Sequence, residues 1–277
     1  MRKACQVCMH HCSLGEGQVG RCGARKRQGE KIASINYGRI SAMALDPIEK
    51  KPLNLFRPGS MVLSVGSFGC NLSCPFCQNH GISMQKGSMA GTVYVSPEEL
   101  AEKALAYQRS GNIGVAYTYN EPLVGWEYVR DTARLVKEHG MENVLVTNGS
   151  ATLEVLAAIL PYIDAMNIDL KGFRAGYYQK LGGDLETVKP FIVHAAASCH
   201  VELTTLVVPG ENDSEAEMEE EAKWIASAVG KDVPLHVTRF FPRYKMAGRD
   251  ATKAEAAYRL ADVARRHLRH VWVGNCR

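Results

Sequence analysis

The sequence predicts an α/β protein in which a partial to nearly complete β/α barrel follows a small cysteine-rich module. Short apolar runs alternate with amphipathic stretches from about residue 61 onward, which is the pattern of βα units around a parallel sheet. Residues 1–30 are instead polar and rich in glycine and cysteine. We therefore expect a cysteine-rich module at 1–30, a connector at 31–60 and the barrel at 61–277.

Each expected strand is a short apolar run bounded by turn-forming residues. The strands lie near 61–67, 112–118, 143–147, 163–168, 201–208, 233–238 and 270–273. Capping residues mark helix starts between them: Ser96 precedes Pro97, and Glu99 completes a capping box. Ser214 and Glu217 repeat this spacing. In a β/α barrel the functional groups gather at the carboxyl ends of the strands.

Composition narrows the class of protein. The chain has 277 residues, of which 46% are hydrophobic, and a formal net charge of +4. It has no apolar run of roughly 18 residues, and its start, MRKACQVC, lacks the apolar stretch of a signal peptide. We therefore expect a cytoplasmic protein with no membrane partner, and the mild basic excess does not indicate a nucleic-acid partner. Because cytoplasmic thiols stay reduced, the nine cysteines point to metal or redox chemistry.

The run GCNLSCPFCQNH, directly after the first expected strand, contains a C-x3-C-x2-C triplet formed by Cys70, Cys74 and Cys77. Thiolates suit iron–sulfur clusters and zinc. A closed zinc site needs a fourth protein ligand, and none follows at short spacing. A four-iron cluster held by three thiolates leaves one iron open. The triplet therefore predicts a [4Fe-4S] cluster, with a structural zinc knuckle as the alternative.

Polar side chains follow the next three strands where each strand ends. Asn120 and Glu121 end the strand in VAYTYNEP, Asn148 follows the strand in VTNG, and Asp169 and Lys171 stand in NIDLKG. Parallel strands end at the same rim of a barrel, so we expect these groups to form a ligand clamp beside the cluster. The alternatives are a turn-opening acid at Glu121 and a surface salt bridge between Asp169 and Lys171.

The triplet, with Phe76 just before its last cysteine, resembles the signature of the radical S-adenosylmethionine (SAM) superfamily. The resemblance implies a barrel of the radical SAM type, whose open iron binds the amino and carboxylate groups of SAM. It also implies that Glu121 matches the glutamate of the family's GGE motif and accepts a hydrogen bond from the SAM ammonium. Tyr119 and Asn120 replace the two glycines, and their backbone would pair with other polar groups of SAM.

The same resemblance suggests roles for the other groups on the rim. Lys171 would bind the SAM carboxylate, and Asp169 would bind a ribose hydroxyl or a positioned ion. Asn148 would belong to the same cofactor-binding set. All three residues follow expected strands, whose ends we expect on the same rim of the barrel as the triplet.

Two narrower likenesses concern the substrate. The strand endings VTNG, DLKG and LVVPG resemble those of glycyl-radical-enzyme activases such as the pyruvate formate-lyase activating enzymes, over roughly residues 60–245. The segments DPIEKKPL, SFGCNLSCPFCQNH, AYTYNEP, IDAMNIDLKGF, ELTTLVVPGENDS and HVTRFFPRYKM are similar to the radical SAM component of the AmmeMemoRadiSam system, nearly across the chain. That likeness implies partner proteins of the system and a protein reductant such as flavodoxin or ferredoxin.

The N-terminal module shares this likeness through Cys5, Cys8, Cys12 and Cys22, spaced C-x2-C-x3-C-x9-C. Four thiolates can close a metal site. A structural zinc would staple a segment too short to fold by burial alone. An auxiliary [4Fe-4S] cluster could instead pass electrons or anchor substrate. Both remain open from the sequence.

The resemblance implies that the reduced cluster cleaves SAM into methionine and a 5′-deoxyadenosyl radical, which then takes a hydrogen atom from the substrate. We therefore expect a radical SAM oxidoreductase- or transferase-type enzyme whose substrate is unknown, with peptides and proteins among the candidates. A glycyl-radical-enzyme activase is the alternative within this class. A non-catalytic zinc-binding scaffold is the alternative outside it.

Overall fold

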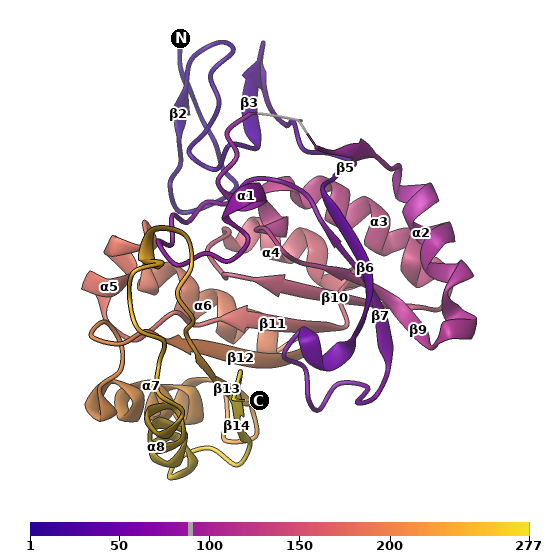
Figure 1. Cartoon of the computed structure of the whole chain (residues 1–277). Helices are drawn as coiled ribbons and strands as arrows, with labels where there is room; N and C mark the ends of the chain where they lie inside the picture. The colour runs from indigo at the N-terminus through magenta and orange to yellow at the C-terminus, as the bar shows by residue number, and fades with distance from the viewer. Residues whose placement is uncertain (88–90, 277) are drawn as a thin grey trace.

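A computed structural model of the chain describes residues 1–87 and 91–276. Its centre is an eight-stranded sheet with the order β14-β13-β12-β11-β10-β9-β7-β6 (Figure 1). The strands are β6 (Ala42–Pro47), β7 (Met61–Gly66), β9 (Asn112–Tyr117), β10 (Glu142–Thr147), β11 (Ala165–Asp169), β12 (His200–Val207), β13 (Leu235–Arg239) and β14 (Val271–Gly274). All neighbouring pairs are parallel except β6–β7. This confirms the predicted α/β class, and the seven expected strands match β7 and β9 to β14 within two residues.

Helices follow the parallel strands and pack against the sheet and against one another (Figure 1). They are α1 (His80–Ser83), α2 (Pro97–Ala106), α3 (Trp126–Glu138), α4 (Leu153–Ile159), α5 (Ala175–Lys180), α6 (Leu185–Ala196), α7 (Glu215–Ala228) and α8 (Ala254–Arg265). Short 3-10 turns are η1 (Ile48–Lys50), η2 (Gln108–Ser110), η3 (Pro122–Gly125), η4 (Leu160–Tyr162) and η5 (Tyr244–Met246). In the part of the chain that the structure describes, no helix combines the length and apolarity needed to cross a membrane.

The two predicted helix caps have different outcomes. At α2, Ser96 accepts a hydrogen bond from the Glu99 backbone and Glu99 bonds back, so the capping box is confirmed. At α7, Ser214 accepts from the Glu217 backbone as expected. The second half of that box is wrong, because the Glu217 carboxylate accepts the backbone N–H of Phe173 at 2.7 Å instead. Glu217 thereby ties α7 to the loop after β11.

Among the described residues, three short two-stranded sheets lie outside the main one. They are β1 (Lys3–Ala4) with β2 (Ser13–Leu14), β3 (Arg25–Gln28) with β4 (Lys31–Ser34), and β5 (Arg39–Ile40) with β8 (Val93–Tyr94). The β3–β4 hairpin crosses residue 30, and β6 joins the main sheet along β7. The division into module, connector and barrel stays a prediction.

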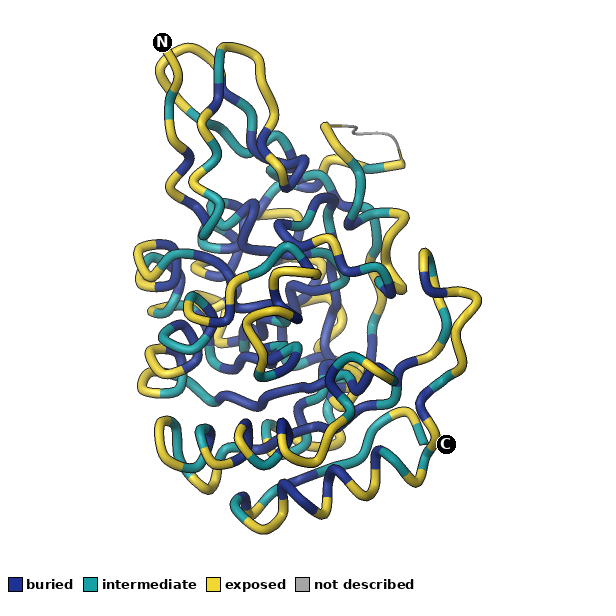
Figure 2. Tube along the Cα trace, turned by 90° about the vertical axis from the view of Figure 1, so that its left-hand side faces the viewer, coloured by how far each residue is buried: buried dark blue, intermediate teal, exposed yellow. Residues whose placement is uncertain are grey.

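The N-terminal hairpins project from the body of the protein and are attached where β7 and β10 end (Figure 1). Cys8 forms an antiparallel bridge with Ala151, and Thr152 donates its backbone N–H to the Val7 carbonyl at 3.0 Å. Figure 2 shows an exposed outer tip and a buried base. The base is therefore part of the packed structure around the strand ends.

The segment 48–55 lies under the starts of the strands. Ile48 and Leu53 are fully buried there, in one apolar cluster with residues of β7, β9, β10 and β11. The buried carboxylate of Glu202 on β12 accepts the backbone N–H groups of Asn54 at 3.0 Å and Leu55 at 2.8 Å. It also lies 2.7 Å from Nε2 of His236 on β13. These contacts hold segment 48–55 against the end of the sheet at which the central strands start.

Candidate functional site

The predicted cluster-binding residues occupy the loop that leaves β7. Cys74 is buried, whereas Cys70 and Cys77 are half-buried. Gly69, at the loop's start, has φ +90°, a conformation that favours glycine. A β-carbon at this position would lie 2.6 Å from the Cys22 carbonyl oxygen. The glycine therefore allows the loop to pass close to the N-terminal module.

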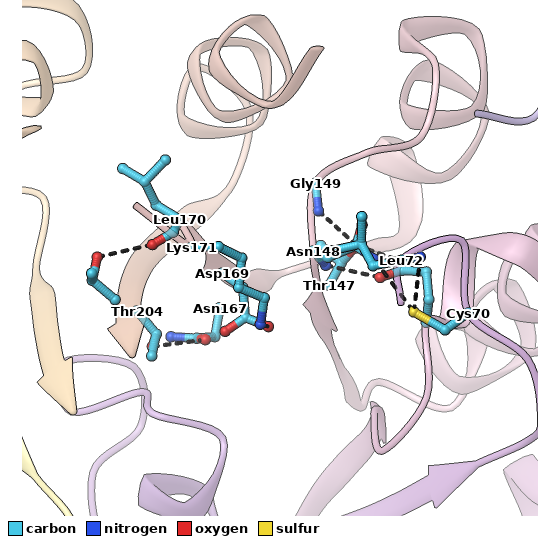
Figure 3. Close-up of polar contacts among 12 residues, drawn as sticks. Cys70, Leu72, Thr147, Asn148, Gly149, Asn167, Asp169, Leu170, Lys171 and Thr204 are labelled. Carbon is cyan, nitrogen blue, oxygen red and sulfur yellow. Dashed lines mark hydrogen bonds and ion pairs between the residues drawn. The ribbon is translucent and has the colours of Figure 1, made fainter. Parts of the chain in front are cut away.

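The sulfur of Cys70 receives two polar contacts. The backbone N–H of Leu72 lies 3.4 Å from it, and Nδ2 of Asn148 lies 3.8 Å away (Figure 3). Burial raises the pKa of Cys70 well above its usual value and that of Cys74 to about 11. The free thiols are therefore protonated at neutral pH, and metal binding would release protons.

Apolar side chains wall the triplet. They belong to the cluster Leu72, Cys74, Phe76, Tyr177, Leu181, Val208, Phe240 and Met246, against which Cys70 and Cys77 pack. Phe76 meets Phe240 edge-on, with ring centroids 6.3 Å apart. N–H groups on sulfur and a dry apolar wall are features that tune iron–sulfur clusters. The three thiols and their surroundings thus fit the ligand set of a [4Fe-4S] cluster.

Glu121 lies at the end of β9 and is buried. Its Oε1 accepts the hydroxyl of Thr147 at 2.7 Å and the backbone N–H of Leu123 at 3.0 Å. Its Oε2 accepts the backbone N–H of Asn148 at 2.8 Å. Burial raises the pKa of Glu121 to about 7, although these hydrogen bonds oppose the rise. Glu121 therefore joins the ends of β9 and β10, and its contact with SAM stays a prediction.

Asn120 and Tyr119 support the loop beneath the triplet. The Asn120 side chain accepts the Ser67 N–H at 2.9 Å and donates to the Gly69 carbonyl at 3.0 Å. Tyr119 has φ +72°, in the left-handed region that glycine adopts freely and that costs another residue about 1 kcal/mol or more. This is the backbone conformation expected if Tyr119 replaces a glycine of the GGE motif, a correspondence that stays a prediction. The Tyr119 hydroxyl donates to Asp46 at 2.8 Å.

Asp169 and Lys171, at the end of β11, form an ion pair of 2.7 Å (Figure 3). Their side chains are only 28% and 14% exposed, so this is no surface salt bridge. Burial opposes the charge of Lys171, but Asp169 and Cys74 together raise its pKa above the usual value. In turn, Lys171 lowers the pKa of Cys74 against the effect of burial. A largely buried cation therefore stands near Cys74, a predicted cluster ligand.

The four N-terminal cysteines line one enclosed cavity of about 10 Å³, together with His10, Gly20, Arg25 and neighbouring apolar residues. The sulfur of Cys8 accepts the backbone N–H of His10, and that of Cys22 accepts the backbone N–H groups of Ala24 and Arg25. Such N–H groups stabilise thiolates. The pKa of the Cys8 thiol is nevertheless raised to about 11, chiefly by burial.

The two cysteine groups have one further property in common. Throughout residues 1–87 and 91–276, no three or more His, Cys, Asp or Glu side chains converge as ligands of a single metal ion would. The thiolates of a four-iron cluster bind separate irons, so they need not converge on one point. For the N-terminal group, the small volume of the cavity favours a single ion such as zinc. The cysteine side chains do not converge as the ligands of a single ion would, which favours a cluster. Zinc and an auxiliary cluster therefore both stay open.

Sequence analysis missed several residues of this site. Asn71 is buried between the two cysteine groups, where its Oδ1 accepts from Asn148 at 2.8 Å. Tyr177, Phe240 and Met246 come from segments far from the triplet and complete its wall. Asn71 directly follows the first cysteine of the triplet, but nothing in the sequence indicates its partner. The wall residues carry only the general signal of apolar side chains.

Comparison with known proteins identifies the family. A model of the radical SAM superfamily matches residues 64–222. Uncharacterized protein MJ0808 of Methanocaldococcus jannaschii is 37% identical over 277 residues, covering 98% of this chain and 80% of that protein. Pyruvate formate-lyase 1-activating enzyme of Escherichia coli is 28% identical over 154 residues, covering 53% of this chain and 61% of the enzyme.

Solved structures agree in fold. Streptococcus suis SuiB has a TM-score of 0.59 at 11% identity, covering 76% of this chain and 48% of that one. QueE from Escherichia coli has a TM-score of 0.51 at 14% identity, covering 85% of this chain and 92% of that one. Because the family model spans more than half of its length, the chain belongs to the radical SAM superfamily.

Proposed function

We propose that this enzyme cleaves SAM reductively at a [4Fe-4S] cluster held by Cys70, Cys74 and Cys77. The resulting 5′-deoxyadenosyl radical would abstract hydrogen from a substrate not yet identified. The observation that carries the proposal is the triplet itself, whose three thiols are packed together, with N–H donors to Cys70 and an apolar wall around them. The bound cluster would supply the electron that breaks the carbon–sulfur bond of SAM.

The chain's own residues would bind and orient SAM beside the cluster. We assign this role to Phe76, Tyr119, Asn120, Glu121, Asn148, Asp169 and Lys171. The ion pair supports the assignment, since Lys171 offers a largely buried cation to the SAM carboxylate and Asp169 offers a carboxylate to a hydroxyl or ammonium. Glu121 would act through Asn148, whose backbone it holds. The apolar wall would limit the access of water.

We further propose a second metal site at Cys5, Cys8, Cys12 and Cys22. The four residues line one cavity, and the buried guanidinium of Arg25 lines it too. Its Nε has no hydrogen-bond partner within the described structure. Its Nη1 is paired with the Glu127 carboxylate at 2.7 Å, so this cation would offset only part of the negative charge of a metal–thiolate site. The residues therefore suit either zinc or an auxiliary [4Fe-4S] cluster.

The likeness to the AmmeMemoRadiSam system favours modification of a peptide, a protein or another substrate of that system, with its other members as partners. A flavodoxin or ferredoxin in the cytoplasm would supply the electron. Activation of a glycyl radical enzyme is the second candidate, and the observation that favours it is the 28% identity to pyruvate formate-lyase 1-activating enzyme. A zinc-binding scaffold without turnover would lack iron altogether.

The test is anaerobic reconstitution, followed by counting of iron, sulfide and zinc and by assay of 5′-deoxyadenosine from SAM and dithionite. Cys74→Ala should lose the cluster and the cleavage. Cys199→Ala is the matched control, because Cys199 is half-buried and packs against the main core. About four irons with one zinc, or about eight irons, would identify the N-terminal metal. Full cleavage in Cys74→Ala, or no iron in the wild type, would overturn the proposal.

A further inference from the structure

The two cysteine groups are joined by a pair of buried amide side chains. The Asn71 side chain hydrogen-bonds the sulfur of Cys8. Oδ1 of Asn71 accepts from Nδ2 of Asn148 at 2.8 Å, and the same Nδ2 lies 3.8 Å from the sulfur of Cys70. A continuous polar chain thus runs from one predicted metal ligand to another. We call Asn71 and Asn148 the amide bridge.

We propose that the amide bridge couples the N-terminal cysteine site to the triplet, so that metal bound at the first site positions a hydrogen-bond donor on Cys70 and tunes the cluster at the second. This inference rests on the proposed function, because it presumes metal at both sites. It concerns two positioning residues, one of which sequence reasoning did not find.

The chemistry of an amide gives the bridge a direction. A metal-bound thiolate at Cys8 can only accept, so it holds the NH₂ group of Asn71. The carbonyl oxygen of Asn71 then faces Asn148 and holds the NH₂ group of that residue. This second NH₂ group is thereby turned toward Cys70. A change at Cys8 that removes the acceptor would free the first amide, and the second would then be held only by the backbone N–H of Ser150 on its Oδ1 at 3.0 Å.

The surroundings prevent the bridge from relaxing. Asn71 is 1% exposed and Asn148 is 5% exposed, so water cannot replace either partner. The Asn71 carbonyl lies 2.8 Å from Nε2 of His10, and the Cys22 carbonyl accepts the backbone N–H of Cys70 at 3.1 Å. The backbone on both sides of the Asn71 side chain is therefore tied to the N-terminal module. Hydrogen bonds in such a dry chain polarise one another.

The expected effect on the cluster has a definite sign. Reduction adds negative charge to an iron–sulfur cluster, and an N–H donor on a ligand sulfur stabilises that charge. Loss of the donor should therefore make the midpoint potential more negative. Asn148→Leu removes the donor directly. Asn71→Leu leaves the donor in place but removes the acceptor that orients it, so its shift should have the same sign and be smaller.

The experiment is a redox titration of the reconstituted full-length protein, followed by electron paramagnetic resonance of the reduced cluster without SAM. It compares the wild type, Asn71→Leu, Asn148→Leu, Cys8→Ala and the double variant Cys8→Ala with Asn71→Leu. The control is Asn143→Leu, since Asn143 is a buried amide on β10 whose partners are Ala133 and Tyr117. Metal counts and thermal unfolding accompany each titration, and a serine variant at the same position replaces any leucine variant that does not fold.

Coupling predicts a potential shift in Asn71→Leu and none in Asn143→Leu. It also predicts that Cys8→Ala changes the potential by different amounts in the wild-type protein and in Asn71→Leu. An unchanged potential in Asn71→Leu, or additive shifts in the double variant, would overturn the bridge while leaving the cluster assignment intact. A wild type with no cluster signal would overturn the proposed function itself.

Discussion

Thr147 donates its hydroxyl to the carboxylate of Glu121 over 2.7 Å, and this contact joins the ends of two neighbouring strands beside the cysteine triplet. Asn148, the next residue, gives the same carboxylate its backbone N–H. The buried carboxylate of Glu121 thus holds the last residue of β10 and the first residue after it against the end of β9.

Glu121→Gln should impair the site without removing iron. All three groups that face the carboxylate are donors, so the amide NH₂ of glutamine must meet one of them. A buried donor left unpaired costs about 1–3 kcal/mol. We expect SAM binding and 5′-deoxyadenosine formation to fall at least about tenfold, measured with the iron content. Glu99→Gln, in the exposed α2 cap, is the control, and full SAM binding in Glu121→Gln would contradict the assignment.

Lys171→Met should weaken SAM binding while the cluster is retained. The variant keeps the length of the buried side chain but removes the cation that pairs with Asp169. Loss of a charge-assisted hydrogen bond of about 1.5–3 kcal/mol corresponds to an affinity lower by roughly 10–150-fold. Equilibrium binding of SAM to the reconstituted protein measures it. Asp169→Asn, which leaves the lysine free, should lose less affinity, and iron loss in Lys171→Met would show that the map of the site is wrong.

Gly69→Ala should disrupt the cluster loop far more than Gly59→Ala does. Both glycines have positive φ, +90° and +80° respectively, so both variants carry similar backbone strain. Only at residue 69 would the new methyl group meet other atoms, 2.6 Å from the Cys22 carbonyl. We expect a loss of bound iron in Gly69→Ala and near-normal iron in Gly59→Ala. Equal iron in the two variants would mean that the close approach to Cys22 is not needed.

Glu221 should make the stability of the protein depend on pH. It is buried at 1% exposure, bonded to the hydroxyl of Thr205, and burial raises its pKa to about 8. In the unfolded chain a glutamate ionises near its ordinary value of about 4.3, so the folded state holds its proton longer. Stability contributed by the protonated acid is therefore lost as the pH rises from roughly 4.5 to 8.

Glu221→Gln removes this titration. Relative to the wild type, the variant should gain at least about 1 kcal/mol in unfolding free energy between pH 5.5 and 8. Denaturant unfolding at the two pH values measures the change. Glu220→Gln, at the exposed neighbouring position, should follow the wild type. The same pH slope in Glu221→Gln and wild type would contradict the assigned pKa.

The parallel strands could be predicted because each is an apolar run buried on both faces, as β11 illustrates with four of its five residues buried. β6 could not, because only one of its six residues is buried and it pairs with β7 in the antiparallel direction. In its sequence, AMALDP, the short apolar run ends in Asp46 and Pro47, and the strand lies at the edge of the sheet. Whether this segment forms the edge strand depends on its pairing with β7 in the folded protein.

The location of the rim residues was also predictable, since parallel strands end together. Their partners were not. Glu121 faces Thr147 across two strands, and Asn71 meets Asn148 from a loop 77 positions away in the chain. Such pairs depend on side-chain rotamers and on the register of neighbouring strands, neither of which leaves a periodic pattern. The types of side chain at the site could therefore be predicted from the sequence, but their hydrogen-bond partners could not.

Segment 48–55 covers the end of the sheet at which the central strands start. Leu53 is fully buried, and Glu202 holds the backbone of Asn54 and Leu55 from within the sheet. A molecule bound at the triplet would therefore be separated from that end of the sheet by packed side chains. A peptide that ran along the strands past the triplet would have to displace this segment.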